Sequence, residues 1–347
     1  MTRILLSLAE SGFIPDFLIK IAARYISNTR LNQQSDDDSK DKIISVLSRG
    51  AVAEKTFDAN EQHYEVPPKF FHYVLGPNLK YSCSLFNDIN SLDDAEESML
   101  KLYIDRADIK DGHEVLDLGC GWGSFSLYVA ERYPDINITS ISNSSDQIAY
   151  IKNEAHKKGL SNIKAFRMDV NNLELNKKYD RIVSIEMFEH LRNYKLILNY
   201  LNHALKPDGK LFIHIFCHKK LTYLYEMKNN FDWMTKYFFQ GGIMPSKDIF
   251  QYFEDELEII NQWDINGNHY SKTCKAWLNN HYKNKKKILD IFEKHYDEPK
   301  IWFNRWRIFF LTCEAFFALH NGNEYFVSHY LLKKSDKKIT SKNYNHI

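Results

Sequence analysis

The chain has 347 residues, of which 44% are hydrophobic and 26% charged, and these values suit a globular protein with one large domain. Its 46 basic and 45 acidic residues leave a net charge of +1, which excludes a global attraction for nucleic acid or anionic membranes. No metal or redox site is expected, because the cysteines are scattered and form no Cys-x-x-Cys pair. They are Cys83, Cys120, Cys217, Cys274 and Cys313. Reduced thiols of this kind favour a cytoplasmic location.

Residues 1–50 are predicted to form a helical N-terminal extension followed by a linker. Glu10, Pro15 and Asp16 interrupt the apolar run near the start, which argues against a secretory signal and a membrane span. Amphipathic helices are therefore expected here, and the alternative is that their apolar face makes a peripheral contact with a membrane or a partner. Residues 32–42 read NQQSDDDSKDK, and this polar composition predicts a mobile linker.

Residues 110–218 carry the pattern of an α/β core. Short apolar runs alternate with helical stretches at 124–132 and 145–158; the runs cover 113–118, 136–141, 163–166, 179–185 and 210–216. This alternation predicts βαβ units, a mostly parallel sheet and helices on both faces. The turn Lys206-Pro-Asp-Gly209 is expected between a helix and the fifth strand. A ligand is expected at the carboxyl ends of the strands.

A glycine-rich loop follows the first predicted strand. Residues 114–125 read EVLDLGCGWGSF and place Gly119, Gly121 and Gly123 at alternate positions. Glycine has no Cβ and adopts positive φ readily, so the backbone of this loop can lie against a ligand. A dinucleotide site would need the spacing G-x-G-x-x-G, whereas this loop is G-x-G-x-G. Together with Asp117, the loop resembles motif I of the class I methyltransferases, which bind S-adenosylmethionine.

Several further motifs resemble the cyclopropane-fatty-acid synthase family and its plant relatives, the coclaurine N-methyltransferases. Upstream are HYEVP at 63–67 and KYSCS at 80–84. Three downstream motifs resemble the coclaurine branch in particular. They are SIEMFEH at 184–190, LFIHIFCH at 211–218 and YFFQGGIMP at 237–245. The similarity spans about residues 12–334.

This resemblance implies a class I methyltransferase, with a Rossmann-like α/β fold around a seven-stranded sheet, a helical N-terminal extension and a helical lid. Residues 51–109 would form lead-in helices over the cofactor, and 110–218 would form the core that binds S-adenosylmethionine. Residues 219–255 would be the lid insertion, and 256–334 would complete the core with helices and the last strands. The basic tail at 335–347 is expected to be disordered.

The resemblance also implies an S-adenosylmethionine site made from four segments. Tyr81 and Ser82 would close over the methionine end, the glycine loop would form the floor, and Gln147 would hold the ribose. The adenine would lie against residues after the third strand. The complete predicted set is Tyr81, Ser82, Asp117, Gly119, Gly121, Gly123, Ser142, Asn143, Gln147, Asp169 and Val170. Ser142 and Gln147 have an alternative interpretation as part of a solvated helix start.

The predicted catalytic residues Glu186, Glu189 and His190 follow the fourth strand, on the ligand side of the sheet. An amine must be neutral to attack a sulfonium methyl group, and it must lose a proton in the reaction. Two carboxylates and an imidazole can anchor an ammonium ion and accept that proton. The sequence therefore predicts methyl transfer to the nitrogen of a small or medium amine.

The synthase branch implies a competing function, in which unsaturated phospholipid acyl chains receive a methylene group and bound bicarbonate takes the proton. In that branch a cysteine, a glutamate, a histidine and a tyrosine hold the bicarbonate. The residues in the matching motifs here are Cys83, Glu189, His214 and Tyr270, so this quartet does not separate the two functions. Glu186 favours the amine, because the synthases usually have glycine there and a buried carboxylate is costly beside a hydrocarbon chain.

Two other features have a plain interpretation. Aromatic residues late in the chain recur near a helical period and are read as core, with a cage for a cation as the alternative; they are Trp302, Trp306, Phe309, Phe316 and Phe317. The run KNKKK at 283–287 is read as a solvated helix face rather than a nucleic-acid contact. No nucleic-acid partner is expected.

Overall fold

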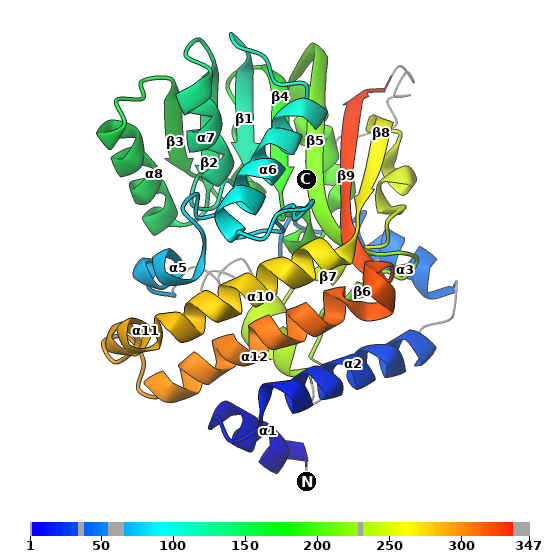
Figure 1. The fold of residues 1–347 in the computed structure, drawn as a ribbon. Coiled ribbons are helices and arrows are strands. Elements are labelled where there is room, and N and C mark those ends of the chain that lie inside the picture. The colour runs from blue at the N-terminus through cyan, green and yellow to red at the C-terminus, as the bar shows by residue number, and fades with distance from the viewer. Residues whose placement is uncertain (1, 34–37, 55–65, 228–231, 336–347) are drawn as a thin grey trace.

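The computed structural model describes residues 2–33, 38–54, 66–227 and 232–335. A seven-stranded sheet forms the upper part of Figure 1, and long helices lie below the ends of its strands. The strands of this sheet are β1 (Glu114–Leu118), β2 (Asn137–Ser142), β3 (Ile163–Arg167), β4 (Tyr179–Ile185), β5 (Leu205–His218), β8 (Leu257–Ile265) and β9 (Tyr325–Lys334).

The strand order is β3-β2-β1-β4-β5-β9-β8, and the pairs from β3 to β5 are all parallel. Strand β9 alone runs antiparallel to its two neighbours. After β1 the chain builds the sheet outward through β2 and β3, and it then returns to place β4 on the other side of β1. This reversal creates a topological switch point, where ligands bind beyond the carboxyl ends of the strands. The predicted mostly parallel sheet is confirmed.

Helices cover both faces of the sheet: α6 (Leu92–Arg106), α7 (Ser124–Arg132), α8 (Ser145–Lys157) and α9 (Tyr194–Ala204). Successive strand residues point to opposite faces, so neighbours in β1 belong to different apolar clusters. Val115 lies in the cluster that contains Tyr103 of α6 and Phe125 of α7. Leu116 lies in the cluster that contains Leu201 of α9. The buried strands are therefore apolar on both sides, as a doubly covered sheet requires.

The fifth strand begins earlier than predicted. The turn expected at Lys206–Gly209 lies within β5, which starts at Leu205. Its pairing with β4 is irregular there, since Tyr179 pairs with Leu205 while Arg181 already pairs with Lys210. A Cβ on Gly209 would lie 2.8 Å from the carbonyl oxygen of Tyr179, so glycine is needed where the extra residues bulge against β4.

The N-terminal extension contains α1 (Thr2–Glu10), α2 (Asp16–Gln33) and α3 (Asp38–Val46). The predicted helices are present, but the predicted linker at 32–42 is wrong where α2 and α3 reach into it; residues 34–37 lie outside the described part. Helix α3 is fixed by a tertiary contact that composition does not reveal. The Nζ atom of Lys40 lies 2.7 Å from a carboxylate oxygen of Asp248.

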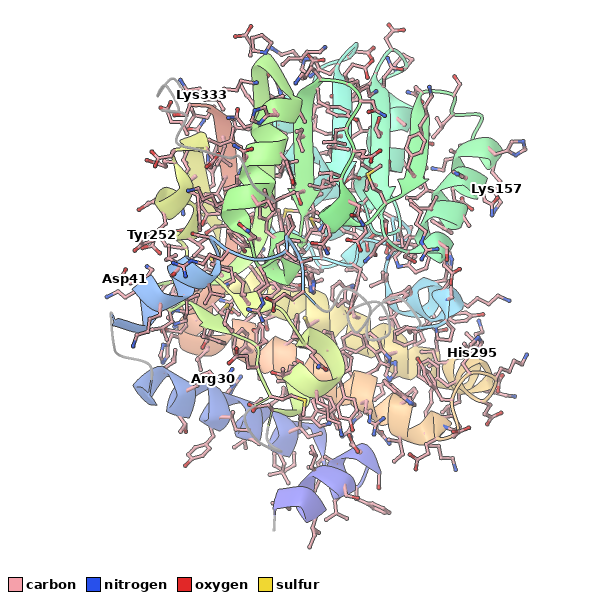
Figure 2. All side chains as sticks on the ribbon, turned by 180° about the vertical axis from the view of Figure 1, so that it is seen from behind. Arg30, Asp41, Lys157, Tyr252, His295 and Lys333 are labelled. Atoms are coloured by element: carbon pink, nitrogen blue, oxygen red, sulfur yellow. The ribbon has the colours of Figure 1, made fainter. Side chains whose placement is uncertain are left out.

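A layer of helices lies below the sheet in Figure 1: α5 (Pro68–Val74), α10 (Gly267–Lys283), α11 (Lys285–Phe292) and α12 (Pro299–Phe317). The acidic residues that interrupt the N-terminal apolar run attach α1 and α2 to α12. Glu10 accepts a hydrogen bond of 3.0 Å from Arg305, and Asp16 accepts one of 2.5 Å from Arg307. Seen from behind in Figure 2, Arg30 of α2 lies below the sheet.

The segment that contains α1 and α2 has exposed apolar side chains. Phe13, between the two helices, is 75% exposed, and Tyr25 of α2 is 72% exposed. The contact of this segment with a membrane or a partner stays a prediction. Among the described residues, no helix is both long and apolar enough to cross a membrane.

The insertion at 219–255 combines short strands with short helical segments. Its described residues form the strand pair β6 (Tyr223–Leu224) and β7 (Ile243–Met244), a turn of π-helix at Thr235–Phe239, and a 3-10 segment at Ile249–Phe253. Residues 233–234 are α-helical and lead directly into the π-helical turn. Helices α2, α10 and α12 also lie below the ends of the strands.

The aromatic residues of α12 confirm the core interpretation in part. Trp306, Phe309 and Phe317 are buried, while Trp302 and Phe316 are partly buried. The lysines of the KNKKK run are exposed around the junction of α10 and α11, as predicted for a solvated face.

Buried His281 should make folding stability depend on pH. Its ring stacks on Phe303 of α12 with 4.0 Å between ring centroids, and Nε2 lies 3.0 Å from the Phe303 carbonyl oxygen. Burial lowers the pKa of His281 from 6.5 to about 3, so between these values the unfolded chain binds a proton that the folded chain does not. The contribution of His281 to the free energy of unfolding is therefore fully present above pH 6.5, and it is lost as the pH falls toward 3.

We expect His281→Gln to flatten this dependence by at most about 1.4 kcal/mol per pH unit, because glutamine does not titrate. Urea unfolding at pH 6.5, 5.5 and 4.5 measures the free energy of unfolding for both proteins. Equal losses of stability in the two proteins would contradict the prediction.

Candidate active site

A cavity of about 1160 Å³ is lined by the carboxyl-end loops of the parallel strands and by residues of α1, α2, α10 and α12. Most of the predicted site residues lie in its wall: Tyr81, Ser82, Asp117, Gly119, Gly121, Ser142, Asn143, Gln147, Asp169, Val170, Glu186, His190 and Tyr270. Four predicted residues do not line it: Cys83, Gly123, Glu189 and His214. The structure thus brings segments far apart in sequence to one site at the switch point.

The three glycines of the loop have different roles. All have positive φ, with values of 78° at Gly119, 52° at Gly121 and 76° at Gly123. A Cβ on Gly119 would lie 2.6 Å from the Met187 side chain, and one on Gly123 would lie 2.6 Å from Ile151. A Cβ on Gly121 would have no atom of the described residues within 4 Å. Gly119 and Gly123 therefore allow close packing, while Gly121 leaves open the space that faces the cavity.

Asp117 joins the end of β1 to the start of α7. Its carboxylate accepts a hydrogen bond of 2.5 Å from the Ser126 hydroxyl, which also lies 2.7 Å from Ser140 on β2. Burial raises the pKa of Asp117 to about 7, and the hydrogen bonds from Ser126 act against this rise. The side chain is a fixed polar group at the floor of the cavity.

Gln147 and Ser142 are not part of a solvated helix start. Ser144 caps α8, and the hydroxyl of Ser142 donates a 2.7 Å hydrogen bond to the Gln147 side-chain oxygen. Gln147 is only 4% exposed and lines the cavity. This hydrogen bond holds the Gln147 amide at the carboxyl end of β2. Asp169 lies in the neighbouring segment, where it caps a short 3-10 turn through the Asn171 N–H.

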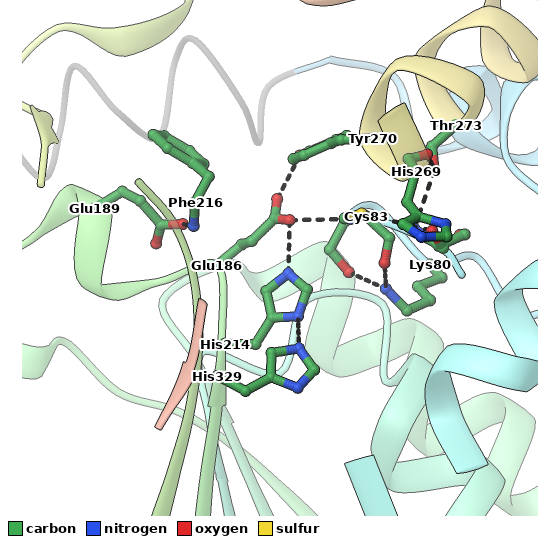
Figure 3. Close-up of polar contacts among 12 residues, drawn as sticks. Lys80, Cys83, Glu186, Glu189, His214, Phe216, His269, Tyr270, Thr273 and His329 are labelled. Carbon is green, nitrogen blue, oxygen red and sulfur yellow. Dashed lines mark hydrogen bonds and ion pairs between the residues drawn. The ribbon is translucent and has the colours of Figure 1, made fainter. Parts of the chain in front are cut away.

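Glu186 is the centre of a buried polar cluster, shown in Figure 3. Its Oε1 atom accepts a 2.9 Å hydrogen bond from the Cys83 backbone N–H and lies 3.0 Å from His214 Nε2. Its Oε2 atom accepts a 2.5 Å hydrogen bond from the Tyr270 hydroxyl. The backbone at Glu186 has a φ of 47°, which is uncommon outside glycine and turns the side chain toward this cluster.

Lys80 supports this cluster and was not predicted, although it belongs to the KYSCS motif. Its Nζ atom donates hydrogen bonds of 2.6 Å to the Ser82 hydroxyl and 2.5 Å to the Cys83 carbonyl. Burial lowers the pKa of Lys80 to about 8. Burial raises the pKa of Glu186, while the bonds from Tyr270 and Cys83 and the charge of Lys80 lower it. Its position in the same motif as the predicted residues Tyr81 and Ser82 could have identified Lys80 from the sequence.

Glu189 contacts the sheet rather than the cavity. Strand β4 ends at Ile185, which pairs with His214, so β4 offers no backbone acceptor to the later Phe216 N–H. The Oε1 atom of Glu189 accepts that hydrogen bond at 3.0 Å. Its Oε2 atom finds no hydrogen-bond partner in the described part of the chain. Burial raises the pKa of Glu189 well above its ordinary value, and the charge of Glu186 adds to this.

His190 lies in the cavity wall and is partly buried. Its ring is parallel to that of Phe239, with 6.5 Å between the ring centroids. Burial lowers the pKa of His190 to about 4, and the charge of Glu186 acts against this change. The imidazole is therefore neutral near pH 7, which is the form in which a histidine can act as a general base.

The comparisons with known proteins agree with this geometry. The family model described as mycolic acid cyclopropane synthetase matches residues 52–325. The chain belongs to this family. The (S)-coclaurine N-methyltransferase of Thalictrum flavum subsp. glaucum is 38% identical over 343 residues, which are 95% of each chain. The cyclopropane-fatty-acyl-phospholipid synthase of Escherichia coli (strain K12) is 31% identical over 220 residues, 62% of this chain and 54% of that one.

A solved structure extends the comparison. The crystal structure of coclaurine N-methyltransferase bound to N-methylheliamine and SAH has a TM-score of 0.91 and 35% identity to this chain. The match covers 96% of this chain and 99% of that one. This member of the mycolic acid cyclopropane synthetase family is therefore an S-adenosylmethionine-dependent methyltransferase.

The wall of the cavity fits S-adenosylmethionine. The open space at Gly121 allows a ligand to approach the backbone closely, and the positive φ values of the loop suit this contact. Gln147 and Asn143 offer amide groups at the carboxyl end of β2, and Asp169 and Val170 follow β3. No basic cradle of the kind that phosphates require lies in this loop, in keeping with a cofactor that has no phosphate. The individual contacts of these residues with the cofactor stay predictions.

Proposed function

We propose that this methyltransferase transfers a methyl group to the nitrogen of a small or medium amine. The observation that carries the proposal is the carboxylate of Glu186 in the cavity wall, with three hydrogen-bond donors aimed at it. A carboxylate that accepts several hydrogen bonds is stabilised in its ionised form, even where burial opposes the charge. An ionised Glu186 supplies the negative charge that an ammonium substrate needs.

Aromatic side chains in the wall of the cavity also support a cationic ligand. Tyr225, Phe239 and Phe309 line it, and their rings pack against one another, with 5.2 Å between Tyr225 and Phe239 and 6.2 Å between Phe239 and Phe309. Aromatic faces attract cations through the negative potential above the ring. An amine with an apolar body would place its nitrogen near Glu186 and the rest of the molecule against these rings.

Other residues of the cavity wall would remove the proton of the amine and exclude water. Glu186 would bind and orient the amine, and neutral His190 would accept the proton that the nitrogen loses. S-adenosylmethionine supplies the methyl group on its sulfonium sulfur when it is bound. Helices α2 and α12 lie between the cavity and solvent, which keeps the reacting nitrogen from water and strengthens its attraction to Glu186. Glu189 would act indirectly, by fixing the end of β5.

The competing bicarbonate mechanism is less favoured for a structural reason. Of the quartet that would hold bicarbonate, Cys83, His214 and Tyr270 already contact the carboxylate of Glu186. The side chain of Glu186 thus uses the donors that a bicarbonate ion would need. A methylene transfer to phospholipid acyl chains would require another group to take the proton.

Mass spectrometry of the products tests the proposal. The purified protein is incubated with methyl-labelled S-adenosylmethionine and, separately, with a pool of amines that includes coclaurine or with phospholipids that have unsaturated chains. We expect one labelled methyl group on an amine and no label in the lipid. A labelled methylene group on a lipid chain would overturn the proposal and restore bicarbonate as the proton acceptor.

A further inference from the structure

A row of hydrogen bonds connects Glu186 to the far side of β9. His214 Nε2 lies 3.0 Å from Glu186 Oε1, and His214 Nδ1 lies 2.8 Å from His329 Nε2. The other nitrogen of His329, Nδ1, lies 2.8 Å from Nη1 of Arg106. Figure 3 shows the two histidines in line below Glu186. The row joins the loop after β4, strand β5, strand β9 and the last residue of α6.

The two ends of this row determine the direction of every bond in it. A guanidinium group can only donate hydrogen bonds, so His329 Nδ1 must be an acceptor and His329 Nε2 must carry the hydrogen. His214 Nδ1 is then also an acceptor, and the hydrogen of His214 lies on Nε2. Nε2–H donates to the Glu186 carboxylate. Every group is satisfied in this arrangement.

The reverse arrangement fails at one end. A protonated Glu186 that donated to His214 would place hydrogens on Nδ1 of both histidines. The Nδ1–H of His329 would then face an N–H of Arg106, and two donors would oppose each other across 2.8 Å. A buried donor without an acceptor costs about 1–3 kcal/mol, more when a charged group is involved. Arg106 thereby disfavours a proton on Oε1 of Glu186, an atom with which it shares no contact.

Burial excludes the remaining alternative, which is a doubly protonated histidine. His214 and His329 are fully buried, and burial lowers the pKa of each well below its ordinary value. The charges of Lys80 and Arg106 act in the same direction. Tyr103 also lies 3.0 Å from His214 Nδ1, so its hydroxyl shares the single lone pair of that nitrogen with His329. Both histidines are therefore neutral, with one hydrogen each.

Arg106 itself is held in place. Its guanidinium carbon lies 4.9 Å above the ring of Trp263 on β8, and Arg106 is only partly buried. Cation–π contact with an indole orients the planar group without using its hydrogen-bond donors. The guanidinium group that determines the direction of these hydrogen bonds is thus held in place, although Arg106 does not line the cavity.

We propose that Arg106 and His329 are positioning residues, which fix the hydrogen of His214 on Nε2 and so keep Oε1 of Glu186 an unprotonated acceptor in the site of the substrate amine. This inference rests on the proposed function of Glu186. It adds two residues that do not line the cavity and assigns each a direction of hydrogen bonding. The expected loss when the row is broken is about tenfold to a hundredfold in kcat, the effect of one hydrogen bond to a charged group.

Nitrogen NMR of histidine side chains tests the row without any turnover. The protein is labelled with 15N-histidine, and the His214 and His329 signals are assigned from His214→Gln and His329→Gln. In the wild type we expect both rings to be neutral with the hydrogen on Nε2 between pH 6 and 8. In Arg106→Met, which removes the donor and keeps an apolar stem, part of the His214 hydrogen should move to Nδ1. An unchanged His214 signal in Arg106→Met would overturn the inference.

Kinetics of matched variants provide the second readout. Arg106→Met and His329→Leu should lower kcat for the methylated amine, while Arg106→Lys and His329→Gln, which retain a donor in the row, should recover most of it. The acid limb of the pH profile should move to higher pH in Arg106→Met, because a proton on Oε1 of Glu186 is then no longer opposed by the row. Affinity for S-adenosylmethionine, measured by calorimetry, should not change.

These outcomes separate the two proposals. If the wild type methylates no amine but the His214 signals behave as described, the row is correct and the proposed function is wrong. If amines are methylated and Arg106→Met equals Arg106→Lys in kcat and pH profile, the positioning role is wrong. Thermal unfolding of each variant identifies any variant that does not fold. If His329→Leu is one of these, the comparison of Arg106→Met with Arg106→Lys decides, because Arg106 is only partly buried.

Discussion

Glu186→Gln is expected to lower kcat for amine methylation by about a hundredfold or more, with little change in affinity for S-adenosylmethionine. Glutamine has nearly the same shape but no charge, so the ammonium form of the substrate loses its partner in the cavity. Its amide nitrogen would also face either the Tyr270 hydroxyl or the donors at Cys83 and His214. Steady-state kinetics with the amine found by mass spectrometry, together with calorimetry of cofactor binding, measures both quantities.

The matched control for this change is Glu189→Gln. Glu189 lies three positions later and is more deeply buried than Glu186, but its carboxylate accepts from the Phe216 N–H and does not line the cavity. Glutamine retains an oxygen for that bond, so we expect a smaller loss of kcat than in Glu186→Gln. A larger loss at Glu189 would mean that the second carboxylate anchors the substrate amine, and the role proposed for Glu186 would be wrong.

Gly121→Asp is expected to weaken binding of S-adenosylmethionine by about a hundredfold or more while leaving the chain folded. The φ of Gly121 is 52°, a region that Asp tolerates better than most residues, and its Cβ would meet no described atom within 4 Å. The folded protein therefore has room for the side chain, but that room is the part of the cavity that the cofactor needs. Calorimetric titration of the cofactor measures the loss, and circular dichroism verifies the fold.

Gly159→Asp is the control for backbone strain. Gly159 also has positive φ, at 67°, and also has no described atom within 4 Å of its Cβ position. It lies after α8 and does not line the cavity, so the same substitution should leave cofactor affinity near the wild-type value. Normal binding by Gly121→Asp, or an equal loss in both variants, would refute the placement of the cofactor against the loop.

The sequence by itself was sufficient for the parallel core and for the loop at which a ligand is expected. Alternating apolar runs and helical stretches predicted the parallel core, because strands buried on both faces must be apolar throughout and helices must have the period of 3.6 residues. The glycine spacing with Asp117 indicated the ligand loop, since positive φ and a missing Cβ are properties of the residue itself. Both signals are local, so they are readable before any tertiary contact is known.

Only the tertiary structure decided which side chain occupies the centre of the site. Glu186 and Glu189 are two carboxylates in one short motif, and their spacing does not state which of them faces the cavity. The left-handed backbone at Glu186 and the end of β4 at Ile185 decide this, by turning Glu186 toward Tyr270 and Glu189 toward β5. Likewise, Arg106 and His329 are 223 positions apart, and they meet only because β9 pairs with β5 beside α6. Contacts between distant segments depend on strand order and packing, which no local pattern contains.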